Sequence, residues 1–77
     1  MTLDALQTGE KAKITKVEGE GSMRKRLLDM GLTPGTNITL FKKAPMGDPI
    51  EIVVRGYHLT LRISDARKIF VAKESAK

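Results

Sequence analysis

The chain has 77 residues, a formal net charge of +5 from 14 lysines and arginines against nine acids, and no cysteine. This length allows one small domain, and so small a core leaves little room for an enclosed active site. The lack of cysteine excludes disulfide scaffolds, thiol nucleophiles and iron–sulfur ligation by the chain, so we expect a reducing, cytoplasmic environment.

The first predicted strand covers residues 10–17. Ala12 and Ile14 alternate there with lysines, which is typical of a half-buried strand. Val17 falls out of phase with them, so we expect a β-bulge near Thr15 that returns Val17 to the core. Two glycines in residues 18–21 then end the strand.

A short amphipathic helix is predicted next, with Ser22 as its N-cap. Its buried stripe consists of three apolar residues at helical spacing: Met23, Leu27 and Met30. Gly31 suits the left-handed position that ends a helix, and Leu32 is expected to fold back onto the last turn. Residues 33–36 predict a type II turn, with proline second and glycine third.

The rest of the chain predicts four more strands and one helical turn. Alternating apolar residues indicate strands over 36–43, 50–54, 59–63 and 68–72. Gly56 and Tyr57 are the expected two-residue link of a type II′ hairpin. Ser64 is expected to cap a helical turn over 64–67, and the tail 73–77 is expected to be frayed.

These elements predict a mostly β fold, in one domain over residues 1–77. Five short strands with one helix between the first and second leave no second layer to cover an open sheet. We therefore expect a small SH3-like five-stranded barrel, because closure removes the exposed edges. The longest apolar run, residues 69–72, is far shorter than the roughly 20 residues of a membrane-spanning helix, so any membrane association is expected to go through a partner.

Four segments in order carry a resemblance to a known family. They are RLLDMGLTPG at 26–35, PMGDPI at 45–50, LTLR at 59–62 and ARKIFV at 66–71. Together they resemble the FeoA family, ferrous iron transport protein A, over nearly the entire chain. The resemblance implies a small cytoplasmic SH3-like accessory protein that works with the FeoB-type GTPase membrane permease. It also implies an alternative, an iron-responsive regulatory adaptor similar to the SH3-like domain of iron-dependent repressors.

Three residues are the candidates for partner binding. Leu28 lies off the buried stripe beside Arg24, and a partly exposed apolar residue next to arginine is typical of an interface. The cluster 24–26 has a simpler interpretation as a solvated helix face. Met46 lies at the apex of the loop 45–49, where it either points outward or folds over the mouth of the barrel.

Candidate metal ligands are few and lack the spacing of a dedicated site. His58 is the only histidine, and Glu18 and Glu20 could add carboxylates to a weak transition-metal site. Surface solvation is the alternative role for His58. We expect no cofactor beyond an adventitious divalent metal, and no iron cage.

Catalysis and nucleic-acid binding are both disfavoured. Ser22 and Ser64 have capping roles, which leaves no Ser–His–acid unit, so no enzyme activity is expected. The basic residues are dispersed and the aromatic residues number only three, too few for a stacking platform. No nucleic-acid partner is expected, although a nucleic-acid-binding small barrel remains an alternative, and the protein is expected to be a monomer or a weak dimer.

Overall fold

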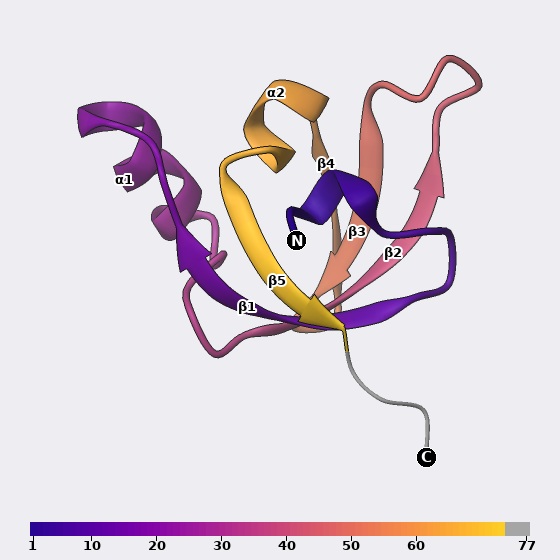
Figure 1. Cartoon of the computed structure of the whole chain (residues 1–77), viewed down its shortest axis with the longest axis horizontal. Helices are drawn as coiled ribbons and strands as arrows, with labels where there is room; N and C mark the ends of the chain where they lie inside the picture. Colours follow the sequence, from indigo (N-terminus) through magenta and orange to yellow (C-terminus); the bar gives the residue numbers. More distant parts are fainter. Residues whose placement is uncertain (74–77) are drawn as a thin grey trace.

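The computed structural model describes residues 1–73 and shows a single curved antiparallel sheet with short helical segments (Figure 1). The strand order in the sheet is β4-β3-β2-β1-β5. In chain order the elements are η1 (Leu3–Ala5), β1 (Lys11–Val17), α1 (Gly21–Asp29), β2 (Asn37–Lys43), β3 (Ile50–Val54), β4 (Tyr57–Leu61), α2 (Ile63–Ala66) and β5 (Ile69–Lys73). The predicted mostly β fold with one helix between the first two strands is confirmed.

The closed barrel is not confirmed, because within residues 1–73 no ladder joins β4 to β5. The sheet instead curls around η1 and α2, which lie inside its curve (Figure 1). Leu3 and Leu6 are fully buried there, together with Ala66 of α2. The sequence reading overlooked this first segment because two leucines three residues apart form no extended periodic pattern. They provide the covering layer that an open sheet needs.

The β5 edge is also covered by the start of the chain. Thr2 forms an isolated bridge with Phe70, and the Val71 N–H donates to the Met1 carbonyl at 2.8 Å. The frayed tail was wrongly predicted to begin at Lys73, which lies in β5 opposite Ala12. Residues 74–77 of that prediction lie outside the described residues.

Two register shifts help the sheet to curl. One lies in the β1–β5 ladder between Ile14 and Lys16, as predicted, and Val17 is buried. The other lies in the β2–β3 ladder between Leu40 and Lys42. In β1 the shift returns Val17 to the core, whereas in β2 every residue after Leu40 is exposed.

The two predicted serine caps are wrong. α1 begins at Gly21 with Glu20 as its N-cap, so Ser22 lies inside the first turn. α2 begins at Ile63, one residue before Ser64, and neither N-cap residue makes a side-chain cap hydrogen bond. In both cases the helix begins before the serine. The serine is then inside the first turn, and its hydroxyl no longer faces the free backbone N–H groups at the start of the helix.

The predicted end of α1 is confirmed. Gly31 has a φ of +95°, its N–H donates to the Leu28 carbonyl at 2.9 Å, and the Leu32 N–H donates to the Leu27 carbonyl at 3.2 Å. This pair of bonds is a Schellman motif. The type II turn follows, with a Thr36 N–H to Thr33 carbonyl distance of 3.1 Å. The chain thus leaves α1 in one defined direction.

The β3–β4 hairpin differs from the prediction by one residue. Val54 pairs with Tyr57, so the link is Arg55-Gly56 rather than Gly56-Tyr57. Arg55 and Gly56 have φ values of +51° and +84°, the combination of a type I′ turn. Leu61 is buried as predicted, whereas Ile63, predicted to continue the strand, opens α2 and is half-buried.

Candidate partner-binding surface

Two residues of the basic cluster 24–26, in the middle of α1, connect the helix to the rest of the fold. The Arg24 Nε donates to the Val17 carbonyl of β1 at 3.1 Å, and the Arg26 guanidinium forms an ion pair with Asp65 of α2 at 3.3 Å. Lys25 pairs with Asp29 within the helix at 3.2 Å. The three residues are all exposed, as the solvated-face interpretation expects, and each also makes a contact with the rest of the chain.

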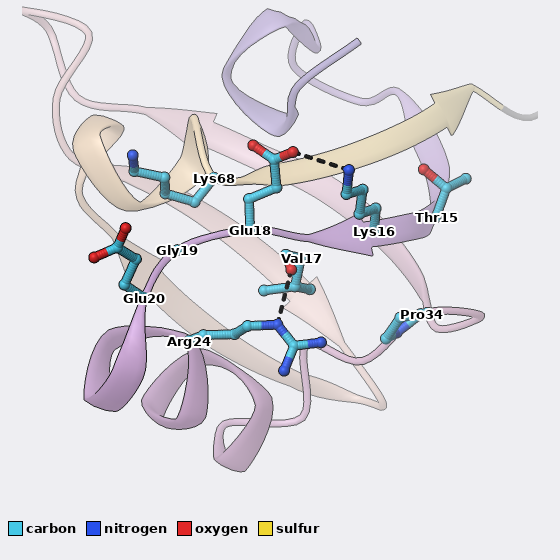
Figure 2. A pocket seen from close by; sticks show the side chains of 9 residues that line it. All are labelled: Thr15, Lys16, Val17, Glu18, Gly19, Glu20, Arg24, Pro34 and Lys68. Carbon is cyan, nitrogen blue, oxygen red and sulfur yellow. Dashed lines mark hydrogen bonds and ion pairs between the residues drawn. The ribbon is translucent and has the colours of Figure 1, made fainter.

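Arg24 still has bonding capacity beyond this contact. Figure 2 shows its side chain reaching from α1 to the Val17 carbonyl, with its terminal nitrogens directed away from Glu18 and Glu20. The hollow beside it, about 590 Å³, carries mixed charge, and Lys16 and Glu18 form an ion pair at 3.0 Å on its rim. This mixture gives the hollow no marked preference for a charged ligand.

Leu28 follows Leu27 in α1 and lies beside the buried face of the helix. Leu27 is fully buried, while Leu28 is half-buried and packs against the edge of the core. Part of the Leu28 side chain therefore remains available at the surface, as predicted. The predicted buried stripe is confirmed only at Leu27, because Met23 and Met30 are half-buried as well.

The β3–β4 hairpin secures the other end of α1. The Tyr57 hydroxyl donates to the Met30 carbonyl, and the Arg55 guanidinium donates to the hydroxyls of Thr33 and Thr36 at 3.3 and 3.2 Å. Sequence reasoning missed these contacts because they join residues 19 to 27 positions apart. An arginine beside a hairpin glycine was their only local signal.

Met46 lies in a separate part of the molecule. It is 91% exposed and points outward, so it does not fold over the sheet. The loop of residues 44–49 is at the opposite end of the long axis from α1 (Figure 1). Arg24 and Leu28 therefore share one surface, and Met46 does not belong to it.

The candidate metal ligands are not brought together. His58 on β4 lies 2.6 Å from a Glu51 carboxylate oxygen and packs edge-on against Phe41, with ring centroids 4.7 Å apart. Glu18 and Glu20 follow β1, which is separated from β4 by two strands. Among residues 1–73 there is no group of three or more histidines and acids that could hold a metal ion.

One carboxylate has a perturbed ionisation. Glu10 accepts from the Lys73 ammonium, 2.8 Å away, and from the Gln7 backbone N–H at 2.7 Å. These two contacts, with a further contribution from the charge of Lys43, lower the pKa of Glu10 below its ordinary value. The pair fastens the start of β1 to the end of β5.

In the part of the chain that the structure describes, no helix is both long enough and apolar enough to cross a bilayer.

Comparison with known proteins identifies a family and a close structural likeness. A model of the FeoA domain matches residues 1–73. The chain is 45% identical over 71 residues to an Fe(2+) transport protein A/Fe(2+) transporter FeoB fusion protein of Porphyromonas gingivalis. That match covers 92% of the chain but only 8% of the fusion protein.

Two solved structures show the same fold. A FeoA-like protein from Clostridium acetobutylicum superposes with a TM-score of 0.91 at 38% identity, over 100% of the chain and 90% of that protein. The FeoA of Stenotrophomonas maltophilia, described as an SH3 domain protein and complexed with zinc, superposes with a TM-score of 0.81 at 28% identity. This match covers 94% of the chain and 89% of that protein, which supports the SH3-like description of the fold.

Proposed function

The chain belongs to the FeoA family, and from this premise we propose that it docks on the cytoplasmic part of a FeoB-type GTPase permease and regulates ferrous iron uptake. The Porphyromonas fusion protein supports the pairing, because it carries a transport protein A part and a FeoB transporter in one chain. Covalent linkage holds two such parts at a high effective concentration. A separate chain must obtain the same proximity from a binding surface.

The α1 surface carries this proposal. Leu28 offers a half-buried apolar contact, and Arg24 beside it keeps terminal nitrogens for a polar one. The helix is held by β1, α2 and β4, so little ordering is left for the binding step. An arginine beside an apolar side chain on a helix already held in place can be bound with little loss of conformational entropy.

Met46 is assigned a second, separate contact with the same large partner, because a loop tip 91% exposed has no packing role of its own. Iron in this scheme is the cargo of the permease. His58 serves the fold by pairing with Glu51, and any divalent metal it binds there is adventitious. The chain works as a monomer or a weak dimer, without a catalytic step.

The test is retention on the detergent-solubilised FeoB-type permease of the same genome, with the nucleotide state varied. We expect Leu28→Asp to weaken retention at least about tenfold, because a charge replaces the apolar anchor. Thr8→Asp, which adds the same charge at an exposed turn, is the matched control and should bind like the wild type. Circular dichroism confirms that each variant is folded.

Two outcomes would contradict the proposal at different levels. Equal retention of a folded Leu28→Asp variant removes Leu28 from the interface. Failure of the wild type to bind in any nucleotide state removes the permease as the direct partner.

A further inference from the structure

The outer face of the sheet carries a row of cations. Successive side chains of a strand point to opposite faces, so the buried Ala12 and Ile14 leave Lys11 and Lys13 on the outside. Lys13 of β1 pairs with Asn37 of β2. Ile38 of β2 pairs with Val54 of β3, so Arg55, which follows Val54, lies across from Asn37. The pairing thus places four exposed residues together, here termed the outer cationic patch: Lys11, Lys13, Asn37 and Arg55.

The charge of this patch is not neutralised within residues 1–73. The ion pairs of that part of the chain involve other lysines and arginines, and none includes Lys11, Lys13 or Arg55. Two shallow hollows of about 400 and 300 Å³ meet at Asn37 and Arg55, and no carboxylate lines either one. The hollow beside Arg24 differs, because Glu18 and Glu20 line it together with its cations.

Arg55 has a backbone conformation that arginine rarely adopts. Its φ of +51° lies in the left-handed region, where a type I′ turn favours asparagine, aspartate or glycine. One terminal nitrogen donates to the Thr33 and Thr36 hydroxyls, which orient the guanidinium. Within residues 1–73 the Nε and Nη1 of Arg55 make no hydrogen bond, so both remain available to donate to carboxylate oxygens.

The patch also adjoins the C-terminal end of α1. Arg55 contacts the turn that follows α1, and the neighbouring Tyr57 bonds to Met30 at the end of the helix. We propose that the outer cationic patch binds an extended acidic segment of a partner protein. This inference rests on the proposed function, in which that partner is the permease.

Two other anionic occupants fit the surface less well. Base stacking needs aromatic side chains, and the patch and its two hollows contain none. The sheet curls around its core, so the outer face is convex (Figure 1), and a flat lipid surface would touch only part of it. An extended peptide can follow the curve and present carboxylates to Arg55 and the lysines in turn.

The test is a titration of isotope-labelled protein with acetyl-hexaglutamate amide, followed by NMR, with hexaglutamine as the neutral control peptide. Shift changes should concentrate at the four patch residues. The patch variant combines Lys11→Gln, Lys13→Gln and Arg55→Asn, and the control variant combines Lys43→Gln, Arg62→Gln and Lys68→Gln. We expect the patch variant to raise the dissociation constant about tenfold and the control, with the same loss of charge, less than about twofold. Asparagine suits the left-handed turn position, so the patch variant should fold.

The same variants are measured on the permease and on two other anionic probes. Equal losses of hexaglutamate affinity in both variants would show that only net charge matters, and this would overturn the inference. Patch-dependent binding of phosphatidylserine vesicles or single-stranded RNA, without binding of hexaglutamate, would also overturn it. Unchanged permease retention by the patch variant, with loss for Leu28→Asp, overturns the inference and leaves the proposed function standing. Hexaglutamate binding at the patch by a protein that the permease does not retain supports the inference and contradicts the proposed function.

Discussion

The two ends of the molecule both present apolar side chains, yet they are built differently. At one end α1 is tied to three other elements, through Arg24 to β1, Arg26 to α2 and Met30 to β4. At the other end the loop 44–49 closes on its own backbone, with an Ala44 N–H to Pro49 carbonyl distance of 2.9 Å. One bond ties this loop to α2, because the Ile63 N–H donates to the Asp48 carboxylate at 3.1 Å, and Met46 stands out from the loop. The α1 surface thus depends on ties to three other elements, whereas the loop is tied to one and its tip at Met46 is exposed.

This difference separates two kinds of exposed apolar residue. Leu28 belongs to a helix whose position is set by the whole fold, so it presents a defined surface with Arg24 beside it. Met46 presents a flexible side chain at the tip of a turn. The first suits a specific anchor, and the second suits an adaptable peripheral contact.

The largest expected effect tests how far the two ends differ in stability. Leu27→Ala should lower the free energy of unfolding by about 2–5 kcal/mol, because it opens a cavity under α1. Met46→Ala should change it by less than about 0.5 kcal/mol, because the side chain is exposed. Urea denaturation followed by circular dichroism measures both. Similar losses would show that the loop is as integral to the fold as the helix.

A smaller effect compares one glycine from each end. Gly31 and Gly47 have similar φ values of +95° and +87°, so alanine at either should cost about 1–2 kcal/mol of backbone strain. A Cβ at Gly31 would also lie 3.2 Å from the Tyr57 hydroxyl, whereas one at Gly47 would meet nothing within 4 Å. Gly31→Ala should therefore cost about 1 kcal/mol more, since it disturbs the bond to Met30.

The Tyr57→Phe background provides the control for this pair. Removing the hydroxyl removes both the close contact and the hydrogen bond to Met30. Gly31→Ala and Gly47→Ala should then cost the same free energy of unfolding. An excess that persists in this background would assign the sensitivity of Gly31 to the Schellman motif alone.

The smallest expected effect is the pH dependence of the Glu10 contact, which joins the start of β1 to the end of β5. Lys73 and the Gln7 N–H lower the pKa of Glu10 in the folded protein. The ionised Glu10 therefore stabilises the fold at a pH above the pKa that it has in the unfolded chain, and this stabilisation is lost as the pH falls through its pKa in the folded protein. As the pH falls below the ordinary pKa of a glutamate, the Gln7 amide should lose protection from hydrogen exchange. Glu10→Gln should lack this transition. A Glu10 carboxyl signal that titrates at its ordinary pKa would contradict the contact.

Much of the fold could be predicted because its signals are local. Alternation marked Ile38 and Leu40 as buried, an out-of-phase Val17 predicted the bulge, and Gly31 predicted the end of α1. Each signal depends on residues within a few positions of one another, where pleat, helical period and left-handed backbone leave a direct trace in the sequence.

Of the candidate site, the sequence indicated single residues but not their arrangement. Leu28 was found from its place on the helix, and Met46 from its place between two prolines. Whether they share a surface depends on how the sheet curls, and they do not (Figure 1). The type I′ turn was missed for a related reason, since only the pairing of Val54 with Tyr57 places Arg55 in the turn.

The sequence alone determined the strands, the inserted helix, the family resemblance and the net charge, because periodicity, backbone preference and composition are properties of neighbouring residues. The tertiary structure decided that η1 and α2 fill an open sheet, that α1 is held from three sides, and that Lys13 and Arg55 meet on one face. Those features join residues far apart in the chain, and their free energy comes from burial and hydrogen bonds that exist only once the strands have paired.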